Sequence, residues 1–164
     1  MSHVTKDTIQ AHNSKSSGRG FCLMTHVDVY DVDVILYCGD EKRCYDTLKK
    51  YCDKHIDYDV NHLYKDVLSY IDSMDNTSSN WCMYSFEKGK SDICLIVVEE
   101  LDLQYSEDLG TLVHETLHAA NYILGKRGVV DDKNGFESMT YLHEYIFKDF
   151  YDKIREKQSK EEKL

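Results

Sequence analysis

Hydrophobic residues switch between a spacing of two and a spacing of three or four along this 164-residue chain, and the order of the switches limits its fold class. Residues 27–37 alternate apolar and polar types and are rich in β-branched residues. They predict a strand with a bulge or break between Val29 and Val32, where the alternation slips. Two short apolar runs at 81–86 and 92–98 predict a hairpin. Helical spacing fills the intervals, so we expect an α+β fold.

Four amphipathic segments are predicted as helices. The first begins after Asp40, which is expected to be its N-cap, and the second covers residues 60–74. The third runs over about 107–124 and stops at Gly125, and the fourth covers about 136–155. The inward face of the first helix is predicted to carry Cys44, Leu48, Tyr51 and Cys52.

Acidic residues outnumber basic ones by 30 to 20, which gives the chain a formal net charge of −10. Such a surface repels phosphate groups, so nucleic acid is excluded as the main partner. No apolar run approaches the ~18 residues of a membrane span, so we expect no membrane partner. Residues 1–20 are polar and lack the apolar core of a secretion signal. We therefore expect a mobile N-terminal segment, one folded domain over 21–164 and a cytoplasmic location.

The six cysteines are expected to be buried free thiols. None of them forms a C-x-x-C pair, the spacing typical of zinc ribbons and redox dithiols. Most lie inside apolar patterns, where a cysteine packs as a small hydrophobic residue.

His114 and His118 flank Glu115 in an H-E-x-x-H motif inside the third predicted helix. Residues four apart lie on the same face of a helix, one turn above the other. Both imidazoles can therefore reach one metal ion, and the glutamate lies beside them, where it can act on a bound water. The motif predicts a zinc site.

The two histidines lie outside the predicted core face of their helix. That face consists of Leu109, Leu112, Val113, Leu117, Ala120, Ile123 and Leu124. Histidines used only for core packing would fall within it, so the pattern favours a metal site. A pair of exposed surface histidines is the alternative.

A catalytic zinc needs a third protein ligand and an open position for water. The downstream candidates are Asp131, Asp132, Glu137, His143 and Glu144. The last helix has an apolar stripe at Phe136, Met139, Leu142, Ile146 and Phe150. His143 falls on that stripe and is predicted to be a core or half-buried histidine. Glu137 lies opposite the stripe in the first turn, while Glu144 shares its side two turns further on. Glu137 is favoured over the aspartates because ligands on helices are held more precisely than ligands on loops.

The spacing His114-Glu115-x-x-His118, eighteen residues and then Glu137 resembles the gluzincin pattern of thermolysin-like zinc peptidases. Residues 114–120 and 137–141 carry the match, which looks like the small single-domain metallopeptidases that phages encode. The resemblance implies a small zincin-like domain with a short mixed sheet, a hairpin packed against the H-E-x-x-H helix and a C-terminal glutamate helix. The metal site would lie within 107–150. It also implies His114, His118 and Glu137 as zinc ligands and Glu115 as general base.

The sequence departs from the thermolysin-like motif Asn-Glu-x-x-Ser-Asp at Phe136, Thr140 and Tyr141. The Asp of that motif orients a zinc-bound histidine, so Tyr141 or Thr140 would have to take over that task. Metzincins are excluded, because this chain has Asn121 and Leu124 where that clan requires Gly and His.

The implied reaction is hydrolysis of a peptide bond. Zinc acidifies a bound water, and Glu115 takes its proton and passes it to the leaving amine. Tyr141 or Tyr145 is the candidate hydrogen-bond donor to the oxyanion. In zincins an edge strand holds the substrate by backbone pairing, which here would be residues 92–98 or their hairpin partner.

Two function classes follow from these residues. The first is a zinc-dependent hydrolase of a peptide or protein substrate, acting in the host cytoplasm if a phage encodes it. The second is a non-catalytic zincin-fold binding or interaction protein with a structural metal, for which the net charge of −10 would suit a basic partner. Retention of Glu115 favours the hydrolase, because a structural site needs no general base. A DNA–protein crosslink protease ranks last, since the basic residues of 153–163 are balanced by acids.

Overall fold

The computed structural model describes residues 20–73, 80–129 and 133–163, and these form a four-stranded sheet with helices on both faces. The strands are β1 (Phe21–Val27), β2 (Val32–Cys38), β3 (Trp81–Ser85) and β4 (Asp92–Val98). The helices are the 3₁₀ turn η1 (Glu41–Arg43), α1 (Cys44–His55), α2 (Asn61–Ser73), α3 (Ser106–Lys126) and α4 (Lys133–Glu161).

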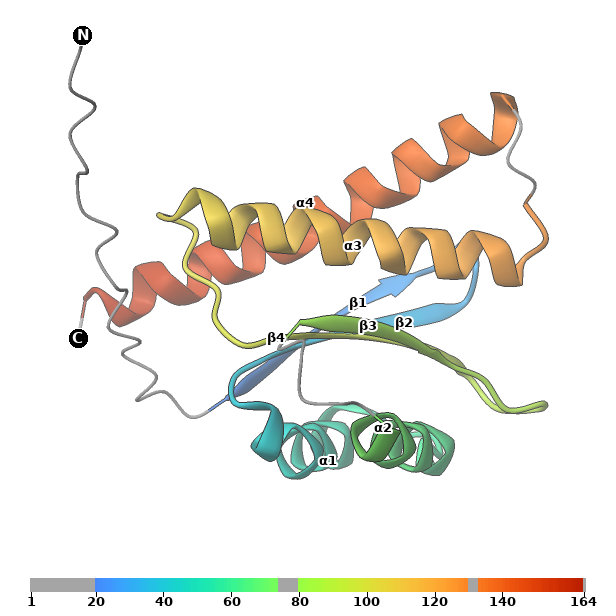
Figure 1. Cartoon of the computed structure of the whole chain (residues 1–164), viewed down its shortest axis with the longest axis horizontal. Helices are drawn as coiled ribbons and strands as arrows, with labels where there is room; N and C mark the ends of the chain where they lie inside the picture. Colours follow the sequence, from blue (N-terminus) through green and yellow to red (C-terminus); the bar gives the residue numbers. More distant parts are fainter. Residues whose placement is uncertain (1–19, 74–79, 130–132, 164) are drawn as a thin grey trace, which may run out of the picture.

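The sheet is mixed, with the strand order β1-β2-β4-β3. The central strands β2 and β4 run parallel, while β1 and β3 pair antiparallel at the two edges. Figure 1 shows α3 and α4 on one face of the sheet and α1 and α2 on the other. Because both faces are covered, every residue of β2 and β4 is buried. The predicted α+β class, the mixed sheet and the 81–98 hairpin are confirmed.

Alternate residues of the central strands point into two separate cores. Leu36 and Ile96 face α3 and α4, whereas Ile35 and Leu95 face α1 and α2. The predicted inward face of α1 is confirmed for its buried residues Cys44, Leu48 and Cys52, and Tyr51 is half-buried. Asp40 caps η1 as expected, since its carboxylate accepts from Lys42 N at 2.9 Å.

The break expected in the first strand is a full turn. Residues 28–31 reverse the chain between β1 and β2, and Asp31 adopts a positive φ of 50° there. β1 was not predicted, because most of its side chains are half-buried on both faces and show no clean alternation.

Two helices extend beyond their predicted ends. α3 continues through Gly125 to Lys126, and α4 runs from Lys133 to Glu161. The added last turns of α4 contain ion pairs four residues apart, Lys157 with Glu161 at 2.6 Å and Lys160 with Glu156 at 2.8 Å. Such pairs support a helix whose composition alone gives no apolar periodicity.

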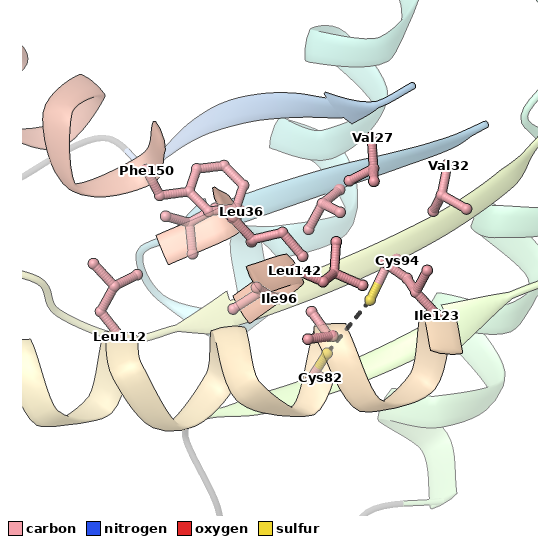
Figure 2. Close-up of a cluster of buried hydrophobic side chains, with 14 of the residues drawn as sticks. Val27, Val32, Leu36, Cys82, Cys94, Ile96, Leu112, Ile123, Leu142 and Phe150 are labelled. Atoms are coloured by element: carbon pink, nitrogen blue, oxygen red, sulfur yellow. Dashed lines mark hydrogen bonds between the residues drawn. The ribbon is translucent and has the colours of Figure 1, made fainter. Parts of the chain in front are cut away.

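Five of the six cysteines are buried, Cys22 is half-buried, and all are free, as predicted apart from that partial exposure. Cys82 and Cys94 lie on neighbouring strands with their sulfurs 3.6 Å apart in the core under α3 (Figure 2). Contact with the Cys94 thiol, together with burial, raises the pKa of Cys82. The Cys82 thiol therefore stays protonated at neutral pH.

His26, near the end of β1, lies among carboxylates of the β1–β2 turn and of β2, which makes local stability depend on pH. His26 Nδ1 lies 2.8 Å from Asp33 Oδ1, and His26 Nε2 lies 3.5 Å from Asp28 Oδ1 and 3.9 Å from Asp31 Oδ1. The hydrogen bond with Asp33 raises the pKa of His26 above its usual value of 6.5. The stabilisation is therefore complete below about pH 6.5 and is lost as the pH rises through the folded-state pKa.

A His26→Gln variant is expected to lose more stability relative to wild type at pH 5.5 than at pH 8.5. Urea unfolding at both pH values measures the two differences. Because the imidazole is 43% exposed, 0.5 M salt should reduce the effect. An equal loss at the two pH values would contradict the assignment.

None of the described helices combines the length and apolar character that a membrane span requires. The predicted mobile segment 1–20 lies outside the described residues except for Gly20, as do Asp131 and Asp132.

Candidate metal centre

The two motif histidines lie side by side on the exposed face of α3. His114 Nε2 and His118 Nε2 are 3.0 Å apart, and the ring centroids are 4.6 Å apart. Two nitrogen ligands of one tetrahedral zinc, each ~2.0–2.1 Å from the ion, are about 3.3 Å apart. The pair therefore fits chelation of one ion with only a small movement of either ring.

The buried side of α3 agrees with the predicted one at Leu112, Ala120, Ile123 and Leu124 and differs at other positions. Val113 and Leu117 are 38% and 44% exposed, although the apolar pattern placed them in the core. Thr116 is fully buried instead, and its hydroxyl donates to Leu112 O at 2.7 Å. A polar residue can take this core position because the helix backbone satisfies its hydroxyl. The core face of α3 consists of Leu112, Thr116, Ala119, Ala120, Ile123 and Leu124.

Glu115 is buried, which its residue type did not predict. Its side chain is only 5% exposed, and its Oε2 has no hydrogen-bond partner in the described structure. Burial raises the pKa of the Glu115 carboxyl, and the neighbouring imidazoles of His114 and His118 oppose that rise. A buried carboxylate oxygen without a partner destabilises the fold, which makes Glu115 a candidate functional group.

The histidine pair and Glu115 open onto a cavity of about 630 Å³. The cavity lies between α3, the beginning of the edge strand β3 and one residue of α2. It is lined by Tyr70, Asn80, Trp81, Cys82, Glu107, Gly110, Thr111, His114, Glu115, His118 and Tyr122. Of the two hairpin strands that the sequence left open, the edge strand is thus β3, because β4 is central in the sheet.

The residues predicted from α4 lie away from this cavity. Tyr141 is 70% exposed and lines a second groove, of about 390 Å³, against the β1–β2 turn. Tyr145 lines the same groove, and its hydroxyl donates to His26 O at 3.0 Å. Glu137 and Glu144 are exposed on α4. Neither tyrosine is therefore placed to donate to a group at the histidine pair.

His143 contacts α3 but not the histidine pair. Its Nε2 lies 3.1 Å from Val113 O and 3.2 Å from Thr116 Oγ1, and its side chain is half-buried as predicted. This contact joins α4 to α3, and His143 is not among the residues that line the cavity.

Within the described ranges, no three His, Cys, Asp or Glu side chains are grouped closely enough to hold one ion. The structure thus brings together two predicted zinc ligands, His114 and His118, with the predicted base Glu115. It does not bring Glu137 into that group.

Sequence reasoning missed most of the cavity wall. Glu107 and Thr111 lie seven and three residues before His114, and Tyr122 lies four residues after His118. Helical spacing alone could therefore have placed them on the same face as the histidines. Tyr70 and Trp81 come from α2 and β3, and only the tertiary fold brings them to α3.

Comparisons of the chain with protein-family models, curated proteins and solved structures find no significant match.

Proposed function

We propose that this chain is a zinc-dependent peptide-bond hydrolase of the zincin type. The observation that carries the proposal is the 3.0 Å separation of His114 Nε2 and His118 Nε2 beside a buried Glu115 with an unpartnered oxygen. Two imidazoles suited to holding zinc and a carboxylate suited to activating a water molecule meet at this cavity.

Glu115 beside the histidine pair favours catalysis over a structural metal. Structural zinc sites are closed by four protein ligands, whereas catalytic sites leave a position for water. The described residues offer two imidazoles at this point, and the imidazoles border a cavity large enough for a substrate side chain and water. Glu115 would serve no purpose at a closed structural site.

His114 and His118 would hold the ion, which would supply acidification of a water molecule to a pKa near neutrality. Glu115 would accept a proton at Oε2, the oxygen that has no hydrogen-bond partner among the described residues. Its pKa, raised by burial, suits a group that must then deliver the proton to the leaving amine. The outer edge of β3 lies at the cavity through Trp81 and Cys82, where an extended substrate could pair with it.

Two roles rest on the sequence alone: Glu137 as third ligand and Tyr141 as oxyanion donor. For the donor, the cavity offers Tyr122, whose ring stacks against His118 at 6.4 Å. Zinc titration of Glu137→Gln tests the ligand role. Weakened binding would mean that α4 rearranges when the ion binds, because Glu137 lies outside the group described above.

The zinc content of protein purified without chelators tests the site itself. We expect close to one zinc ion per chain in wild type, and a loss of at least tenfold in affinity for His118→Ala, because one imidazole cannot hold the ion alone. Elemental analysis after gel filtration measures the content.

His55→Ala is the matched control, because it removes an exposed histidine from another helix. Its zinc content should equal that of wild type. A folded wild-type protein that binds no added zinc would contradict the proposal, as would a His118→Ala protein that retains it.

A further inference from the structure

The cavity beside the histidine pair is acidic. Its lining includes the carboxylates Glu107 and Glu115, and none of the residues that line it is lysine or arginine. The Oε2 atom of Glu115 is buried and has no hydrogen-bond partner among the described residues. The carboxyl group of Glu115 is therefore left without a compensating group in the cavity wall, whether it is charged or protonated. With a net charge of −10 on the whole chain, this cavity suits cationic groups.

The same cavity has aromatic walls. The ring of Tyr70 lies 4.6 Å from the ring of Trp81, and Trp81 Nε1 donates to Glu41 Oε1 at 3.1 Å, which fixes the indole. Tyr122 provides a third ring. Aromatic faces next to a carboxylate attract ammonium and guanidinium groups through cation–π and ionic interactions together.

The spacing along α3 matches the length of one basic side chain. Glu107 and His114 are seven residues apart on the same side of α3, which corresponds to about 10 Å along the axis. A lysine whose carbonyl lies at the histidine pair can hold its ammonium about 7 Å away along its four-carbon stem. A hydrogen bond from that ammonium to a carboxylate adds about 3 Å, so the lysine covers the same distance of about 10 Å.

From these observations we infer that the Glu107 end of the cavity is a specificity site for the lysine or arginine side chain next to the bond that is cut. The inference rests on the proposed function for the position of that bond. Glu107 receives the cationic group, and Tyr70 and Tyr122 flank the apolar stem. Peptides with a basic residue at this position are therefore the substrate class.

A binding experiment tests this site independently of catalysis. Trp81 is the only tryptophan of the chain and lines the cavity, so its fluorescence reports occupancy. N-acetyl-lysinamide is compared with N-acetyl-norleucinamide, which has nearly the same shape and no charge. We expect the lysine compound to bind wild-type protein about tenfold more tightly at low salt.

Variants distinguish the effect of Glu107 on binding from the effect of the overall negative charge of the chain. Glu107→Gln should remove the difference in affinity between the two compounds, and Glu107→Asp should retain part of that difference. Glu87→Gln, which changes the same charge in the β3–β4 turn, should leave it unchanged. Gly110→Phe should weaken both compounds, because a side chain there meets no atom within 4 Å and projects into the cavity.

Mapping cleavage sites by mass spectrometry distinguishes this inference from the proposed function. Selective binding of the lysine compound without any peptide cleavage would uphold the specificity site and overturn the hydrolase. Peptide cleavage without preference for basic residues, with equal binding of both compounds, would uphold the hydrolase and overturn the specificity site.

Discussion

Glu115→Gln is expected to lower the rate of peptide hydrolysis by about 10²–10⁴-fold, the usual contribution of a general acid–base group. Glutamine keeps the size of the side chain but cannot accept the proton from a water held at the histidine pair. Zinc content should stay at the wild-type value, because the roles assigned here leave Glu115 outside the ligand set. Cleavage of an unstructured protein such as casein, followed by mass spectrometry, measures the rate.

The matched control is Glu144→Gln, which makes the same change at an exposed position of α4. It should cleave at the wild-type rate and bind zinc normally, and this also tests Glu144 as a ligand. Wild-type activity must disappear with a chelator and return with zinc, which excludes a contaminating serine protease. A Glu115→Gln protein with undiminished activity would contradict the assigned base.

The sequence predicted the motif face of α3 well and its core face only in part. Residues four apart are on the same side of any α-helix, so the proximity of His114 and His118 follows from the backbone alone. The core face depends on what packs against the helix. Val113 and Leu117 remain partly exposed because the sheet meets α3 along Leu112, Thr116 and Ile123. No count of apolar residues could have selected the threonine.

The cavity illustrates the same distinction between local and tertiary information. Glu107 and Tyr122 could be deduced from helical spacing, but Tyr70 and Trp81 reach the site only because β3 is the edge strand beside α3 and α2 covers the opposite face. Burial of Glu115 likewise depends on these neighbours. For the same reason Glu137, chosen from its position on a helix wheel, could be assigned a side of α4 but not a distance from α3.

Phe150→Ala is expected to cost about 3–5 kcal/mol of folding stability, the range for removing a buried phenylalanine ring. Phe150 is fully buried, and Figure 2 shows it with Leu142 of α4 in the same cluster as Leu36 and Ile96 of the central strands. The closely packed cluster cannot collapse fully into the space the ring leaves. Urea unfolding followed by circular dichroism should show a lower midpoint with an unchanged slope.

Phe136→Ala is the matched control on the same helix. The sequence placed Phe136 on the apolar stripe with Phe150, but its side chain is 68% exposed, so its removal should change stability by no more than about 0.5 kcal/mol. Equal losses in the two variants would contradict the packing of α4 described here.

The Phe150→Ala variant also tests what α4 contributes to the metal centre. As placed here, α4 supports α3 through the buried cluster and through His143, and none of its described His, Asp or Glu side chains joins His114 and His118 in a group that could hold an ion. Phe150→Ala should then lose zinc only to the extent that it unfolds. At a temperature where circular dichroism shows it folded, it should still bind close to one ion. Weaker zinc binding by the folded variant would mean instead that α4 takes part in the site, as the Glu137 ligand role requires.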